Sequence, residues 1–223
     1  GKPLRHFWRV RFVGPSPSGA FGEPLNADRY RQSPNTIPAA YLPRTLPWIE
    51  ISADTDRAIV ITEGELKAAC AAKYGFACIG LGGVWMFRHK QTRFLPELEA
   101  INWSKRNTFI AFDSEVNDGT RPDLLPAQIL LANELRKRGA LVHIAVLPPS
   151  PPHKIGLDDY VLAKPEDQRA EHLRALFDSA PQADAQTLSR AAMNLRYAYV
   201  TTNDAIYSEE IHSLLSVHGT RND

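Results

Sequence analysis

Acidic residues that follow apolar runs are the residues of this chain best suited to chemistry. Three such runs are followed by carboxylates: Glu63 after the first, Asp113 and Glu115 after the second, and Asp158 with Asp159 after the third. The carboxyl ends of parallel strands lie at one edge of a sheet, where α/β enzymes keep their active sites. Carboxylate oxygens are also the ligands that Mg²⁺ prefers. The pattern therefore predicts a metal-dependent phosphoryl-transfer centre.

Strand-like and helix-like stretches alternate from residue 57 onward and must position these carboxylates. We expect strands over 57–62, 76–80, 107–112 and 140–147, and helices over 65–74, 91–100, 122–138 and 165–179. Such alternation is typical of a parallel sheet with right-handed crossovers. The predicted fold class is α/β, with a central parallel sheet of about four strands flanked by helices.

The regular pattern covers only the middle of the chain. In residues 1–54, one short stretch at 6–13 has the alternating side-chain pattern of an edge strand, and the rest is rich in proline. This composition predicts an irregular β-rich lead-in. Residues 55–180 form the predicted catalytic domain. Residues 181–223 are expected to be a linker and the beginning of a following segment, with a strand at 196–202 and a helix at 209–217.

Composition narrows the class of protein. The chain has 223 residues, 43% of them hydrophobic, which is enough for a full core. It has no apolar run of the roughly 20 residues that a membrane span needs and no signal-peptide pattern at its beginning, so we expect a cytoplasmic protein without a membrane partner. Cys70 and Cys78 lack metal-ligand spacing and are expected to be buried free thiols.

Basic residues gather in two places although the formal net charge is only +1. Arg9 and Arg11 alternate with apolar residues on a predicted edge strand. Arg88, Lys90 and Arg93 follow Trp85 and Phe87, and this mixture can stack bases and neutralise phosphates. These five basic residues are candidates for binding nucleic acid, although a half-buried strand and a buried aromatic pair would explain the same patterns.

Three segments resemble the signature blocks of Toprim domains, in the same order and strand context. They are Ile61-Thr-Glu-Gly-Glu-Leu-Lys-Ala, Ala111-Phe-Asp-Ser-Glu and Lys154-Ile-Gly-Leu-Asp-Asp-Tyr-Val-Leu. The resemblance covers about residues 55–162 and is closest to Toprim-like domains in replication proteins of phages, plasmids and other mobile elements. It implies a Toprim-like Rossmannoid fold. Two positions depart from the family pattern, since Glu115 replaces the second Asp and Lys67 stands where classical bacterial-type primases place an Asp.

The resemblance assigns a role to each acidic residue. It implies that Glu63 is the general acid/base and also a metal ligand. Asp113 and Glu115 are spaced to chelate one Mg²⁺ or Mn²⁺ from an extended loop. Asp158 would add an outer ligand or cap the following helix, and Lys154 would meet a phosphate. Glu65 and Asp159 would contact the metal ligands and orient them without binding the metal themselves.

The leading hypothesis is a mobile-element primase domain that synthesises primers from nucleotides on single-stranded DNA. A Toprim nuclease would use the same carboxylates, and a non-catalytic module that binds single-stranded DNA or a helicase is the third possibility. A topoisomerase is disfavoured, because no companion domain offers a catalytic tyrosine. We expect the chain to be part of a longer replication protein, with a helicase domain as its partner in the same or another chain.

Overall fold

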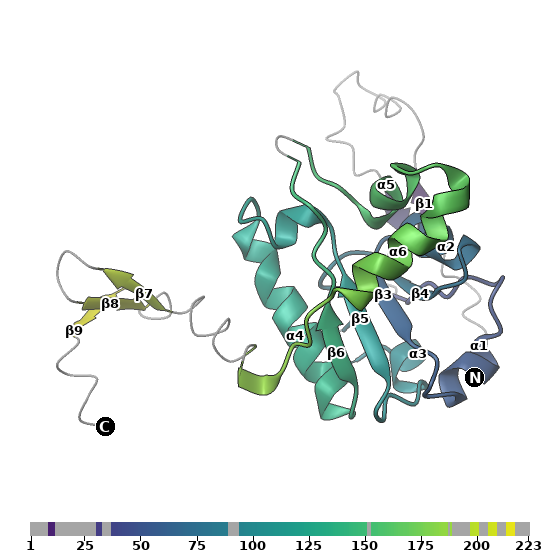
Figure 1. The fold of residues 1–223 in the computed structure, drawn as a ribbon. Helices are drawn as coiled ribbons and strands as arrows, with labels where there is room; N and C mark the ends of the chain where they lie inside the picture. Colours follow the sequence, from purple (N-terminus) through teal and green to yellow (C-terminus); the bar gives the residue numbers. More distant parts are fainter. Residues whose placement is uncertain are drawn as a thin grey trace, which may run out of the picture. The chain divides into compact units, whose positions relative to one another are not determined.

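A four-stranded parallel sheet is the centre of the computed structural model of this protein (Figure 1). The structure describes residues 9–11, 30–32, 37–88, 94–150, 153–186, 188, 197–200, 205–208 and 213–216. The strand order is β4-β3-β5-β6, with every neighbouring pair parallel. The strands are β3 Ile59–Glu63, β4 Ala77–Leu81, β5 Asn107–Ala111 and β6 Leu141–Ile144. The predicted α/β fold class is confirmed.

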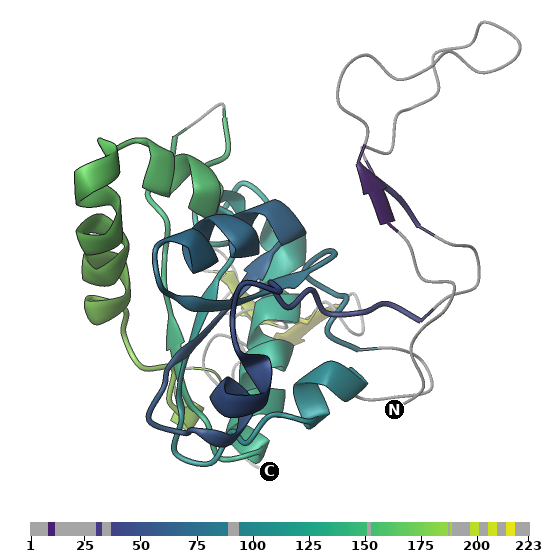
Figure 2. The same ribbon diagram turned by 90° about the vertical axis from the view of Figure 1, so that its right-hand side faces the viewer.

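Helices cover both faces of this sheet (Figure 1 and, turned by 90°, Figure 2). Along β3, Ile59 and Ile61 pack into one core cluster, while Val60 between them packs into the other. This alternation follows from the two-residue period of a strand. The first face carries α1 Trp48–Ala53, α3 Pro96–Glu99 and α4 Leu125–Lys137, and the second carries α2 Glu65–Lys73, α5 Leu157–Leu162 and α6 Arg169–Asp178.

The segment that precedes α1 and β3 forms backbone hydrogen bonds with the outer edge of β4. Tyr41 and Gly80 form an antiparallel bridge, with N–O distances of 2.8 and 2.9 Å in the two directions. Such a bridge satisfies the backbone groups that an edge strand would otherwise expose. Further along, Ile51 of α1 is 1% exposed within the core. Residues 39–54, which the sequence places in an irregular lead-in, therefore contribute a helix and an edge contact to this unit.

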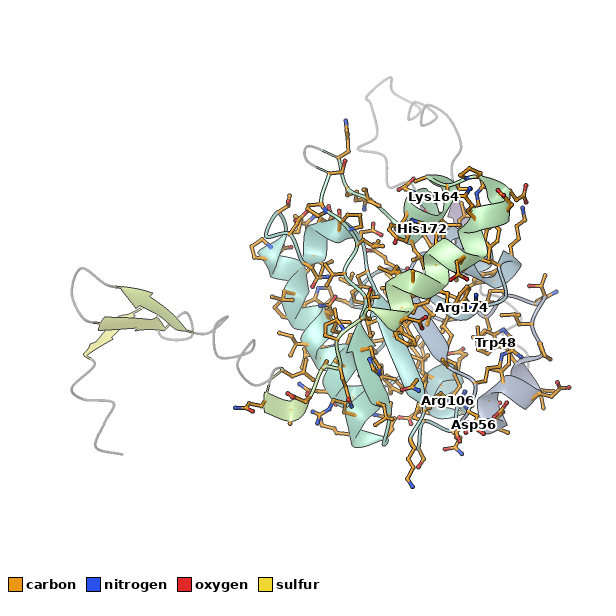
Figure 3. The ribbon with its side chains drawn as sticks, viewed as in Figure 1. Trp48, Asp56, Arg106, Lys164, His172 and Arg174 are labelled. Atoms are coloured by element: carbon orange, nitrogen blue, oxygen red, sulfur yellow. The ribbon has the colours of Figure 1, made fainter. Side chains whose placement is uncertain are left out.

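Arg106, just before β5, is fully buried at the amino end of the sheet (Figure 3). Its guanidinium donates to the carbonyl oxygens of Ile51 and Ser52 in α1, at 2.9 and 3.1 Å. It also donates to the carbonyl oxygens of Arg57 and Asn102, both at 2.7 Å. The side chain thus joins α1 to β5. It is a structural residue and not part of a basic surface.

Short strands lie outside the parallel sheet. The chain divides into the units Gly1–Pro38 and Ala39–Asp223. In the first, β1 Arg9–Arg11 pairs antiparallel with β2 Tyr30–Gln32. Near the other end, β7 Tyr197–Val200, β8 Ala205–Ser208 and β9 Ser213–Ser216 form an antiparallel sheet. The helix expected at 209–217 is wrong, because pairing with β8 holds residues 213–216 as a strand. In the described residues no helix is long and apolar enough to cross a membrane.

Candidate carboxylate and lysine site

Glu63 is the last residue of β3, and the chain turns directly after it into α2. Gly64 makes this turn at φ 101°, a conformation that side chains disfavour. Its N–H donates to the carbonyl oxygen of Leu81 at the end of β4. Asp113 lies two residues beyond the end of the neighbouring strand β5. Both carboxylates therefore reach the carboxyl edge of the sheet, as the sequence predicts.

Asp113 is fully buried and forms ion pairs with two lysines. Its Oδ1 accepts a short hydrogen bond from Lys67 Nζ on α2, and its Oδ2 lies 2.8 Å from Lys154 Nζ. A buried carboxylate needs such partners, because an unpaired charge away from water is costly. We refer to Glu63, Lys67, Asp113, Glu115 and Lys154 as the carboxylate–lysine site.

Ser114 fixes the backbone that carries Lys154. The Ser114 N–H donates to the carbonyl oxygen of Ile155 at 2.9 Å, and the Ile155 N–H donates back to Ser114 Oγ at 3.0 Å. This reciprocal pair ties the third signature block to the second. Lys154 Nζ consequently lies beside Asp113 and also within 3.5 Å of Glu115 Oε1.

Burial raises the pKa of Glu63 above its ordinary value, and the negative charge of Asp113 raises it further. The charges of Lys67 and Lys154 act in the opposite direction, and that of Glu115 adds to the increase. The net effect is a carboxyl group that holds its proton closer to neutral pH than a solvated glutamate does. This property suits a group that must both accept and donate a proton.

Gly156 makes room for Lys67 to reach Asp113. A Cβ atom at position 156 would lie 2.6 Å from Lys67 Cε and 2.7 Å from Asp158 Oδ1. Asp158, in the first turn of α5, therefore lies close to Gly156, and its Oδ1 is buried without a hydrogen-bond partner among the described residues. Asp159 accepts the Gly156 N–H at 3.0 Å and so caps α5. Glu65 begins α2.

The segment after Asp113 differs from the expected extended loop. Ser114–Val116 forms a turn of 3-10 helix, because Ser114 is held to Ile155 and the Val116 N–H donates to the Asp113 carbonyl. Asp113 and Glu115 therefore do not lie two residues apart on an extended segment, which would direct both side chains the same way. Lys154 Nζ, rather than direct contact, connects the two carboxylates.

The carboxylates of this site are candidate ligands for a divalent cation. In the described part of the chain, no three His, Cys, Asp or Glu side chains converge closely enough to hold a metal ion as they stand. Lysine ammonium groups contact both oxygens of Asp113. The donor chemistry nevertheless fits Mg²⁺ or Mn²⁺, since Asp113 and Glu115 offer hard carboxylate oxygens to a position that the Lys154 ammonium occupies between them. Glu63, Asp113 and Glu115 are the residues that would hold the ion.

Apart from Lys154, the predicted nucleic-acid contacts fall outside this site or outside the described side chains. Arg88 is exposed, with Cζ 5.2 Å from the ring centroid of Trp85, which is itself 38% exposed. Lys90 and Arg93 lie outside the described residues. Arg9 and Arg11 belong to β1, where the structure describes the backbone alone. The interface with nucleic acid therefore stays a prediction.

Sequence reasoning missed four residues of the site and its surroundings: Lys67, Ser114, Gly156 and Arg121. The exposed Arg121 lies close enough to Glu115 and Glu63 for their charges to contribute to the increase in its pKa, although Asp123 is the main cause. Lys67 has no local signal, because its partner Asp113 lies 46 residues further along the chain. Ser114 and Gly156 have no local signal, because their partners are distant in sequence.

A family model described as "Domain of unknown function (DUF3854)" matches residues 48–168. The match covers more than half of the 223 residues, and the chain belongs to this family. It includes all five residues of the carboxylate–lysine site. No curated protein matches the chain.

Among solved structures, the chain is similar to the crystal structure of the Aquifex aeolicus primase, zinc binding and RNA polymerase domains. The TM-score is 0.45 and the sequence identity is 16%. The similarity covers 76% of this chain and 38% of the primase chain, so this chain spans well under half of that protein's length.

Proposed function

We propose that this domain catalyses metal-dependent nucleotidyl transfer in DNA replication, as a Toprim-like primase domain that synthesises primers on single-stranded DNA. The observation that carries the proposal is Glu63, a carboxyl group with a raised pKa at the point where the three signature blocks meet. Perturbed groups at the carboxyl edge of a parallel sheet are typical of active sites.

In the proposed reaction, Glu63 exchanges a proton with the attacking or leaving oxygen through its carboxylate. A pKa closer to neutral lowers the cost of transfer in either direction. A Mg²⁺ or Mn²⁺ ion, when bound, would neutralise phosphate charge and favour ionisation of the attacking hydroxyl. Lys67 holds Asp113 in place, and the Ser114–Ile155 bonds keep the third block against the second.

A second candidate function is a binding module without catalysis. The observation that favours it is that Lys67 and Lys154 already neutralise Asp113, so the site as described has little need of a cation. In that case, single-stranded DNA or a helicase would be the partner, and Glu63 would not exchange protons with a substrate.

The test is to incubate the full chain with single-stranded DNA, labelled nucleotides and either Mg²⁺ or Mn²⁺. Wild type is compared with Glu63→Gln and with Glu171→Gln, a control on α6 whose carboxylate pairs with exposed Arg174 at 2.8 Å. Extension by wild type and the control but not by Glu63→Gln would support the primase. Shortened DNA would assign the nuclease chemistry instead. DNA left unchanged by wild type with both metals would refute catalysis and favour the binding module.

A further inference from the structure

Lys67 and Lys154 contact the same carboxylate but differ in exposure. Lys67 is 17% exposed, and its side chain packs so closely against Gly156 that a Cβ atom there would lie 2.6 Å from Lys67 Cε. Lys154 is 50% exposed and approaches Asp113 from the solvent side. Lys67 is therefore enclosed by protein, whereas the ammonium of Lys154 can leave Asp113 without any change in the core.

The backbone near Lys154 has its own anchor. The two hydrogen bonds between Ser114 and Ile155 do not involve the Lys154 side chain. Rotation of that side chain would keep the third block attached to the second. Moving Lys154 thus requires side-chain rotation alone, and rotamer changes of exposed side chains are fast.

Lys154 also occupies the place of a bridging cation. Its Nζ lies 2.8 Å from Asp113 Oδ2 and 3.5 Å from Glu115 Oε1, and so connects two carboxylates that do not share another ion pair in the described residues. Within the carboxylate–lysine site, withdrawal of Lys154 leaves the carboxylates of Glu63, Asp113 and Glu115 with Lys67 as their counter-ion. The formal charge that remains is that of two carboxylates, which a divalent cation would balance.

We propose that Lys154 is an exchangeable counter-ion, which holds the cation position between Asp113 and Glu115 in the metal-free protein and leaves it when a divalent cation binds. Lys67 stays on Asp113 in both states. This inference rests on the metal-dependent function proposed above. The two lysines thus have different tasks: Lys67 pairs with Asp113 permanently, whereas Lys154 competes with the metal for Asp113 and Glu115.

Direct measurement of Mn²⁺ binding tests the inference. Free Mn²⁺ is followed by electron paramagnetic resonance during titration of the full chain as wild type, Lys154→Met and Lys73→Met. Lys73 is the matched control, since it lies at the far end of α2 in an exposed pair with Glu166. Removing a competing charged contact should tighten Mn²⁺ binding roughly tenfold in Lys154→Met. Lys73→Met should bind like wild type.

The inference is overturned if Lys154→Met binds Mn²⁺ no more tightly than wild type, or if neither binds it. A second measurement uses wild type alone, in case the variant does not fold. An amine-acylating reagent is applied with and without Mn²⁺, and modified lysines are identified by mass spectrometry. Lys154 should become more reactive with Mn²⁺, while Lys67 stays protected. Unchanged or reduced reactivity of Lys154 would also refute the exchange.

These readouts separate the inference from the proposed function. If primer extension is absent but Lys154→Met still tightens Mn²⁺ binding, the primase proposal fails and the exchange stands. If extension occurs but Lys154 neither competes with Mn²⁺ nor changes its reactivity, the exchange fails and the primase proposal stands.

Discussion

The ammonium of Lys67 on α2 donates a hydrogen bond to the buried Oδ1 of Asp113, 46 residues further along the chain. This contact joins the first signature block to the second across neighbouring strands. It pairs a predicted metal ligand, Asp113, with a lysine that the sequence identifies only as a departure from the family pattern. The stability of the metal-free site should depend on it.

Asp113→Asn should destabilise the metal-free protein by about 2 to 3 kcal/mol, because both lysines lose the carboxylate that balances them. If the site held carboxylates without lysines, Asp113→Asn would instead leave stability unchanged or increase it, since removing a negative charge would relieve repulsion. Urea unfolding without divalent cations measures the difference. Glu166→Gln is the control, as it breaks only an exposed pair with Lys73 and should change stability by less than about 1 kcal/mol. A variant as stable as wild type would contradict the stabilising role of the ion pairs.

Gly156→Ala should destabilise the protein by about 1 to 3 kcal/mol, because the new Cβ would press on Lys67 Cε and Asp158 Oδ1. The backbone at φ −88° and ψ 169° accepts alanine, so the cost would come from these contacts. Gly83→Ala is the matched control, since the nearest atom lies 3.9 Å from its Cβ position. Equal effects of the two substitutions in urea unfolding would argue against the tight fit at residue 156.

A double-variant cycle isolates the Lys67 contact. In a Lys67→Ala background, Gly156→Ala should lose much of its effect, because the side chain that it displaces is gone. Additive effects of the two substitutions would show that Gly156 acts independently of Lys67.

Arg106→Met should reduce stability by about 3 kcal/mol, because four hydrogen bonds to buried or partly buried carbonyl oxygens are lost together. Arg174→Met on the exposed surface of α6 is the control and should stay within about 0.5 kcal/mol of wild type. Thermal or urea unfolding of both variants measures this difference. Similar stabilities of the two variants would contradict the structural role of Arg106.

The parallel sheet could be predicted from the sequence because its signals are local. Buried strands such as β3 are continuous apolar runs, and the helices between them have their own period. The positions of Glu63 and Asp113 at one edge follow from that topology without any knowledge of side-chain contacts. Strand ends shifted by one to three residues, which does not change the edge they reach.

The lysines could not be placed from local signals. Lys67 was interpreted only as a departure from a family pattern, because its partner is fixed by the register between β3 and β5. The burial of Arg106 has no local signal either, because its acceptors are carbonyl groups up to 55 residues away. In both cases the contacting groups come from other elements of the fold, which the charge pattern along the chain does not contain.

The final prediction concerns the pH dependence of stability through Glu63. Burial and Asp113 raise its pKa above 4.5, so the folded state holds the proton more tightly than the unfolded state does. This contribution is fully present below the unfolded pKa and is lost as the pH rises through the folded pKa. Glu63→Gln removes the titration while keeping the shape of the side chain.

In metal-free buffer, the stability of Glu63→Gln relative to wild type should therefore be lowest below the unfolded pKa, increase as the pH rises through the folded pKa, and then stay level. Urea unfolding of both proteins at a series of pH values gives this difference, in which titrations common to both cancel. Glu171→Gln, which alters only an exposed carboxylate, should show no such increase. A difference that stays constant with pH, or that falls as the pH rises, would mean that Glu63 ionises at least as easily in the folded protein as in the unfolded chain. Its assignment as the proton-exchanging group would then lose its physical basis.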